Sequence, residues 1–260
     1  MKILKWIAAT VLLVGLSALL GLILFGFSQR YRETSELIAA DELTAAKSVP
    51  ESIMDLPLHD IRPGSYYTSA RLLDATLIDG FPCAAGDVRF FTRSGRLSGC
   101  VIAEDAVIGG NLIPQNTKVE LYAESTYWRY FFPENTNIQG ISCTGGKVGL
   151  TRSTDIPTAL YPSGRLRGCY SSSNVTIQEI PCRKTNFGLL TSTPLYIETP
   201  IFLHENGSVR SCTLSRDAEI DGQSIPARSE IVISEDGEVK IVDASWKRRT
   251  GLWFDGIFGH

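Results

Sequence analysis

The sequence lacks a concentrated excess of charge of either sign, and it has few histidines. Its 25 lysines and arginines and 28 aspartates and glutamates give a formal net charge of -3, and the basic residues are scattered. Nucleic-acid-binding proteins normally carry a concentrated basic patch. There is no C-x-x-C pair, and none of the histidines (His59, His204 and His260) lies at zinc-finger spacing from a cysteine pair. We therefore expect no nucleic-acid partner, no metal site and no cofactor.

The motifs of the common enzyme classes are also absent. The chain contains no G-x-S-x-G, phosphate-binding loop, H-E-x-x-H or Cys-His nucleophile arrangement. His204, beside Glu205, is interpreted as a solvated turn histidine. Pairs of neighbouring carboxylates could serve a glycosidase, but they fall in turns, where charge keeps a loop solvated: Glu104 with Asp105, Asp217 with Glu219, and Glu235 with Asp236. We expect no enzyme; the alternative is an envelope enzyme that acts on a polysaccharide through these carboxylates.

What the sequence does contain, at its start, is a long uncharged segment. Residues 6–27 carry no charge, and as a helix they would span about 33 Å, enough to cross a hydrocarbon core of about 30 Å. A cleaved signal peptide and a retained anchor are the two interpretations. The run exceeds the roughly 7 to 15 residues of a signal-peptide core and no A-x-A-like cleavage site follows it, which favours a single-span membrane anchor over residues 1–28. Lys2, Lys5 and the terminal amine precede the run, and Arg30 and Arg32 follow it. By the positive-inside rule, this small excess before the run leads us to expect that the rest of the chain is exported.

The segments that flank the central part of the chain have their own composition. Residues 29–63 are predicted to form a stalk, with a short helix over residues 35–47 that ends before Pro50. The tail, residues 244–260, combines three consecutive basic residues with four aromatic ones. Such a tail suits a membrane interface, and equally a strap that lies against the last hairpin.

From residue 77 onward the sequence is periodic. Five similar openings, "LIDG", "VIGG", "NIQG", "TIQE" and "EIDG", begin at residues 77, 107, 137, 176 and 219 and define five units. Each unit alternates short apolar runs with glycine-containing turns, the signature of a β-hairpin. Residues 64–77 match the hairpin part of a unit and form an N-terminal half-unit. We therefore predict a mainly β domain over residues 64–243, built of tandem β-hairpins as a meander, solenoid or closed barrel. The longer units three and four are expected to carry loops at residues 151–159 and 191–200.

The phrase [FY]-x-x-x-G-x-L within these units resembles the hairpin repeats of MORN-type proteins and of related bacterial envelope proteins with aromatic-glycine units. The resemblance covers about 170 residues, but the G-x-G signature of MORN repeats is missing. MORN proteins are scaffolds and membrane-associated adaptors. The resemblance thus implies interaction with a partner rather than chemistry.

Six cysteines, an even number, all lie between residues 83 and 212. In an exported chain this count favours disulfides over free thiols. Units one, three and four hold two cysteines each, whereas units two and five hold none, so the two positions are filled together or left empty together. Pairing within units leaves no cysteine unpaired, and pairing between units would leave two. We predict three bonds: Cys83 with Cys100, Cys143 with Cys169, and Cys182 with Cys212.

Arginines recur at matching positions of the units. Arg71, Arg96 and Arg165 occupy the position after the turn, and Arg167 and Arg210 occupy the position two residues further on. Stacked units could line these side chains into a stripe, because residues two apart on a strand face the same side. Arginine suits phosphate and carboxylate ligands, so an anionic lipid or cell-wall polymer is the expected ligand. The competing interpretation is a charged face that only prevents aggregation.

These observations together predict a membrane-anchored, exported repeat protein. Its repeat domain is expected on the periplasmic or extracellular side, where it would act as a binding or structural module of the cell envelope. Its partners would be the membrane, an anionic lipid or polymer, or another protein.

Overall fold

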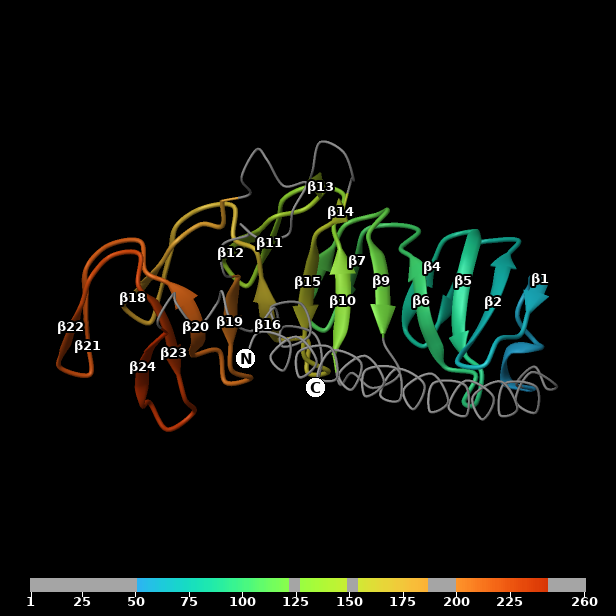
Figure 1. Ribbon diagram of the computed structural model, residues 1–260. Coiled ribbons are helices and arrows are strands. Elements are labelled where there is room, and N and C mark those ends of the chain that lie inside the picture. The colour runs from blue at the N-terminus through green and yellow to red at the C-terminus, as the bar shows by residue number, and fades with distance from the viewer. Residues whose placement is uncertain (1–50, 122–126, 149–153, 187–199, 243–260) are drawn as a thin grey trace, which may run out of the picture.

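The computed structural model describes residues 51–121, 127–148, 154–186 and 200–242. After a single 3-10 turn, η1 (Glu51–Ile53), all regular elements are antiparallel strands. Twelve of them form one sheet in which each strand pairs with its neighbours along the chain, so the fold is a meander. Figure 1 shows these strands side by side from β1, drawn blue, to β24, drawn red. They are β1 (Leu58–Arg62), β2 (Tyr67–Leu72), β5 (Gly86–Phe91), β6 (Leu97–Val101), β9 (Lys118–Leu121), β10 (Trp128–Phe131), β15 (Pro157–Leu160), β16 (Leu166–Cys169), β19 (Ile201–Leu203), β20 (Val209–Thr213), β23 (Glu230–Ile233) and β24 (Val239–Val242).

Every unit also contains a second, shorter hairpin, which forms from the opening of the unit. The two central residues of its turn both have positive φ, as at Asp79 (+48°) and Gly80 (+83°). Two-residue turns of this type match the twist of the two strands that they connect. We predicted one hairpin per unit, and this was wrong because the opening forms a hairpin of its own. The short hairpins are β3 (Thr76–Ile78) with β4 (Phe81–Cys83), β7 (Ala106–Ile108) with β8 (Asn111–Ile113), β11 (Thr136–Ile138) with β12 (Ile141–Cys143), β17 (Val175–Ile177) with β18 (Ile180–Cys182), and β21 (Ala218–Ile220) with β22 (Gln223–Ile225).

The core lies between one face of the long sheet and the layer of short hairpins. The alternating residues of β2 and β5 that face this layer are buried, including Val88 and Phe90. From the hairpin side they meet residues such as Ile78 and Phe81, and the same cluster continues through all five units. A two-stranded hairpin alone is marginal in water, so this shared core is what makes each unit stable.

The three predicted disulfides are confirmed. Each joins the second strand of a short hairpin to the second strand of the long hairpin in the same unit: Cys83 to Cys100, Cys143 to Cys169, and Cys182 to Cys212. No cysteine is free. Backbone hydrogen bonds flank each bond, as where Ala84 N donates to Val101 O at 2.7 Å. The disulfides therefore tie the two layers together, and such bonds are typical of an oxidising, extracytoplasmic environment.

The units without cysteine use apolar side chains at the same positions. In unit two, Ile113 occupies the position in its short hairpin that Cys83 occupies in unit one. Tyr130 corresponds to Cys100, because both residues pair with Val119, one from each side of β9. In unit five the corresponding residues are Ile225 and Ile241. Ile113 and Ile225 are both fully buried. Unit two thus depends on packing where the others have a covalent bond, and in unit five only Ile225 is packed in this way, because Ile241 is 53% exposed.

A β-bulge in each of units one, three and four turns the cysteine toward the core. Strict alternation from the turn would place Cys100 on the same face as Arg96. The register of the long hairpin shifts instead between Arg89 and Phe90, between Ala159 and Leu160, and between Phe202 and Leu203, which inserts one extra residue on the partner strand. The extra residues are Ser98, Arg167 and Arg210. The bulge occurs in unit four as well, although Ser211 rather than glycine follows the extra residue there.

The structure differs from the sequence prediction at several segment boundaries. The sheet begins at β1, within the predicted stalk, and Ile53 is already buried in the core. The predicted loop at residues 151–159 was wrong in part, because β14 (Thr154–Asp155) pairs with β13 (Lys147–Val148) and β15 begins at Pro157. Among the described residues no helix is long and apolar enough to cross a membrane. The predicted membrane span, the helix at residues 35–47, all but the last residue of the loop at residues 191–200, and the tail at residues 244–260 lie outside the described residues.

Candidate functional site

The second face of the long sheet is not covered by the short hairpins, and we call it the open face. On β5 it carries Asp87, Arg89 and Phe91, which alternate with the core residues. One residue per strand lines up into a continuous row across all twelve strands, which we call the central row. It runs Arg62, Ser69, Arg89, Gly99, Glu120, Arg129, Ala159, Gly168, Phe202, Ser211, Val232 and Lys240.

Two glycines in the central row let long neighbouring side chains lie flat on the sheet. Arg89 extends across Gly99 to Glu120, with Nη2 donating to Oε1 at 2.7 Å, and a Cβ on Gly99 would lie 3.3 Å from Arg89 Nη2. The ring of Phe202 covers Gly168 in the same way, since a Cβ there would lie 2.5 Å from Phe202 Cδ1. At these two glycines of the central row, a long side chain from the neighbouring strand thus lies flat on the sheet.

Cations and aromatic rings alternate beside the central row. Tyr127 has the guanidinium of Arg167 over its ring at 3.8 Å and that of Arg129 at 5.9 Å. Lys118 lies 5.2 Å from the centroid of Phe131, while its Nζ donates to Glu120 Oε1 at 2.7 Å. A cation over a ring face is attracted by the ring quadrupole, which holds the charged group in a fixed place.

Arg167 has unused hydrogen-bonding capacity. Its Nη1 is buried and has no hydrogen-bond partner, although the guanidinium is fixed against Tyr127. A buried donor without a partner costs about 1 to 3 kcal/mol, and more when charged. An anion that approached this group would remove that cost.

The open face is basic although the chain as a whole is acidic. Its strand and bulge positions hold eight basic residues, Arg62, Arg71, Arg89, Lys118, Arg129, Arg167, Arg210 and Lys240, against four acidic ones, Asp60, Asp87, Glu120 and Glu230. The formal net charge of the chain is -3. Glu120 alone accepts from both Arg89 and Lys118. The excess of positive charge is therefore a property of this face.

The five predicted ligand-binding arginines do not form one stripe. Arg167 and Arg210 share the bulge position, and Arg71 lies on the open face, 3.6 Å from Asp87. Arg96 and Arg165 are exposed in the turns of long hairpins, four strands apart in the sheet, or about 19 Å at ordinary strand spacing. Sequence reasoning missed Arg89, Lys118 and Arg129, although the strict alternation in "DVRFF" and "KVELY" could have placed the first two on an exposed face.

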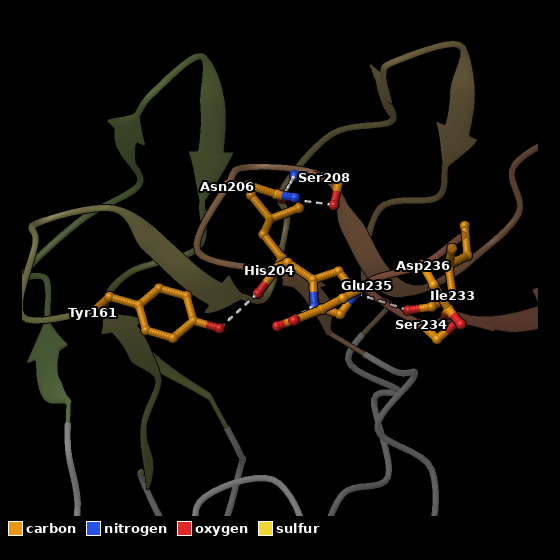
Figure 2. A network of polar contacts seen from close by, with 9 residues as sticks. Tyr161, His204, Asn206, Ser208, Ile233, Ser234, Glu235 and Asp236 are labelled. Carbon is orange, nitrogen blue, oxygen red and sulfur yellow. Dashed lines mark hydrogen bonds and ion pairs between the residues drawn. The ribbon is translucent and has the colours of Figure 1, made fainter. Parts of the chain in front are cut away.

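The turns of the long hairpins in units three to five are linked to one another (Figure 2). His204 is buried rather than solvated, contrary to the sequence interpretation: its Nε2 donates to Ile233 O at 2.8 Å, and its Nδ1 lies 3.7 Å from Glu235 Oε1. Tyr161 Oη donates to Leu203 O at 3.0 Å. His204 therefore connects neighbouring hairpins, because the hairpin stacking covers a turn that would be exposed in isolation.

A polar cleft of about 770 Å³ opens between the turns of short and long hairpins in units two to four. Gln139, in the turn of β11 and β12, joins this turn to the turn of β15 and β16. Its Nε2 donates to Gly164 O at 3.0 Å, and its Oε1 accepts from Leu166 N at 3.2 Å. Arg165 lines this cleft, and its Nη1 donates to Asn206 O at 3.5 Å. The polar groups here are largely occupied in joining the two layers.

Three of the turn carboxylates considered for a glycosidase, Asp105, Asp217 and Asp236, make hydrogen bonds within their own turns and hairpins. Asp105 and Asp217 each accept from a backbone N–H ten residues further on, Gln115 N and Ala227 N, and so close the base of a short hairpin. Hydrogen bonds from Ser234 and from the backbone lower the pKa of Asp236. Among the described residues no group of His, Cys, Asp and Glu could hold a metal ion.

No protein-family model, curated protein or solved structure matches this chain.

Proposed function

We propose that this chain is a membrane-anchored, exported binding module of the cell envelope. The observation that carries the proposal is the chemical difference between the two faces of the long sheet. One face is closed by short hairpins and disulfides, and the other presents cations and aromatic rings on most strands from β1 to β24. A scaffold that only filled space would gain nothing from a charged donor held without a partner, as in Arg167.

Location outside the cytoplasm is supported by three disulfides in the repeat domain, and attachment by the uncharged run at residues 6–27. The MORN-type resemblance also favours a scaffold or adaptor over an enzyme. A protein partner or a lipid surface would be accommodated by the same anchored arrangement.

Protease accessibility of the full chain in spheroplasts tests the proposal. We expect the repeat domain to be digested from outside intact spheroplasts, and a short membrane-embedded fragment to remain. A soluble mature form that begins near Ser28 would contradict the anchor. Protection of the whole chain until the spheroplasts are lysed would contradict export.

A further inference from the structure

We propose that the open face binds a linear acidic polysaccharide, laid along the central row across the strands. The inference rests on the proposed function, because it assigns the ligand class of that binding module. The short hairpins leave this face free, and the ligand is specified by three features of it: length, flat aromatic surface and fixed positive charge.

The length of the open face suits a polymer rather than a small molecule. The central row passes through twelve strands, which at about 4.8 Å between strands is roughly 53 Å from Arg62 to Lys240. Small-molecule sites are normally concave pockets that enclose their ligand. A row of this length, in which long side chains such as Arg89 and Phe202 lie over buried small residues, offers repeated contacts to a repeating chain.

Aromatic rings recur on every third strand of the open face. Phe91 lies on β5, Phe131 on β10 and Phe202 on β19, and all three are partly exposed. Phe202 stands in the central row, whereas Phe91 and Phe131 lie two residues from it on opposite sides. Phe202 lies flat over Gly168. The C–H-bearing face of a sugar ring is apolar and stacks on such rings, which have large apolar faces. A polyanion without rings would have no use for them.

Positive charge lies between these rings and is held in place. Arg129 and Arg167 both stand over Tyr127: Arg129 shares β10 with Phe131, and Arg167 lies on β16, beside the β19 strand of Phe202. The buried Nη1 of Arg167 has no hydrogen-bond partner. Guanidinium groups bind carboxylates in a planar, two-bond geometry. Sugar rings with a carboxylate at intervals therefore match the pattern of rings and arginines better than a neutral glycan does.

A lipid surface fits the open face less well. The exposed apolar side chains that could insert among lipid tails, such as Leu77, Val107 and Leu112, project from the short hairpins on the opposite side of the molecule. The rings of the open face are only partly exposed and lie against the sheet. The exposed valines of this face, Val101 and Val232, lie seven strands apart, so a membrane that met only this face would find charge but no continuous apolar anchor.

Binding of the full chain, purified in a non-ionic detergent, tests the inference. Three acidic polysaccharides (polygalacturonate, alginate and hyaluronate) are compared with neutral dextran, with polyglutamate and with phosphatidylglycerol vesicles. We expect at least one acidic polysaccharide to bind, with an affinity that falls as salt rises. Dextran should not bind, and polyglutamate and the vesicles should bind at least tenfold more weakly.

Matched variants locate the site. Arg167→Gln and Phe202→Ala should each weaken polysaccharide binding about tenfold or more, because each removes one contact of the row. Arg165→Gln, a turn arginine outside the open face, and Leu112→Ala, an exposed apolar residue of a short hairpin, should leave it within about twofold. Melting temperatures identify any variant that fails to fold, and Arg210→Gln then replaces it as the second test of the row.

The inference is overturned if no acidic polysaccharide binds, if polyglutamate or vesicles bind equally well, or if the control variants lose as much binding as the row variants. These outcomes are independent of the spheroplast experiment, since the purified chain is tested without regard to its location. A protein found in the envelope that binds none of the polysaccharides would keep the proposed function and lose its ligand class.

Discussion

Polar aromatic residues are buried in this protein, although their residue types are often found at surfaces. Among them, Tyr130 and Tyr170 are buried in units two and three, and His204 is buried between the turns of units four and five. Two of these have a local reason. Tyr130 fills the space that a disulfide occupies in other units, and His204 donates to Ile233 O. Burial disfavours the phenolate and raises the pKa of both tyrosines, that of Tyr170 to about 12.

The raised pKa of Tyr170 predicts a loss of stability in alkali. In the unfolded chain the phenol titrates near pH 10, whereas in the folded chain it stays neutral until about pH 12. The folded state therefore holds the proton more tightly, and the free energy of unfolding should fall as pH rises from about 10 to 12, by about 3 kcal/mol once Tyr170 has ionised. Denaturant unfolding across this range measures the fall.

Tyr170→Phe should remove about that part of the alkaline loss and leave the curve below pH 9 with its original shape. Tyr66→Phe is the control, because Tyr66 is exposed. An alkaline slope for Tyr170→Phe equal to that of the wild type would show that burial of this phenol is not what limits stability in alkali.

At the scale of elements, the tip of a short hairpin meets the turn of a long hairpin from the next unit. Gly109, in the turn of β7 and β8, lies so close to Gly164 that a Cβ on Gly109 would be 2.6 Å from the Cα of Gly164. Asn111 Nδ2 donates to Gly164 O at 2.7 Å across the same contact. Both glycines have positive φ. This contact closes the edge of the core between units two and three.

Gly109→Ala and Gly110→Ala separate the contact from the backbone conformation. Both residues have positive φ, but a Cβ on Gly110 meets nothing within 4 Å. Each alanine should cost about 1 to 2 kcal/mol for the left-handed backbone. Gly109→Ala should cost about 1 to 3 kcal/mol more, because it forces two backbones apart. Chemical denaturation compares the two variants, and equal costs would mean that the tip contact contributes nothing.

How much of these elements the sequence predicts depends on whether the signal is local. The disulfides follow from the joint presence of cysteines within a unit, and the long hairpins from alternation around glycine turns. Gly99 and Gly168 are residues that permit a bulge, but the bulge at Arg210, which Ser211 follows, could not be predicted, because the register of a strand is decided by its partner. Strict alternation without bulges places Arg96 and Arg165 in the predicted arginine stripe, although both lie in turns. It does not predict the central row, which contains Arg89 and Phe202.

At the scale of the whole molecule, the units form a one-dimensional array in which each hairpin contacts its neighbours in the sheet order. In such arrays stability is the sum of unit and interface contributions, so a weak interior unit can uncouple the two sides. Unit two has no disulfide and stands between unit one and unit three, which both have one. Unit five has none either, but it lies at the end of the described sheet. The same defect should therefore have different consequences in the two places.

Ile113→Ala and Ile225→Ala place the same defect in these two units. Both isoleucines are fully buried at the same strand position, so each variant should lose about 2 to 5 kcal/mol of local stability. In unit five the loss should only fray the end, with one main unfolding transition retained. In unit two it should split unfolding into two transitions, since the part before it is held by Cys83–Cys100 and the part after it by the other two disulfides. Denaturant titration combined with hydrogen exchange distinguishes the two cases. In Ile113→Ala we expect the amides of β7–β10 to exchange before those of the other strands.

A single coincident unfolding transition for both variants would mean that the sheet unfolds as one cooperative body, although unit two has no disulfide.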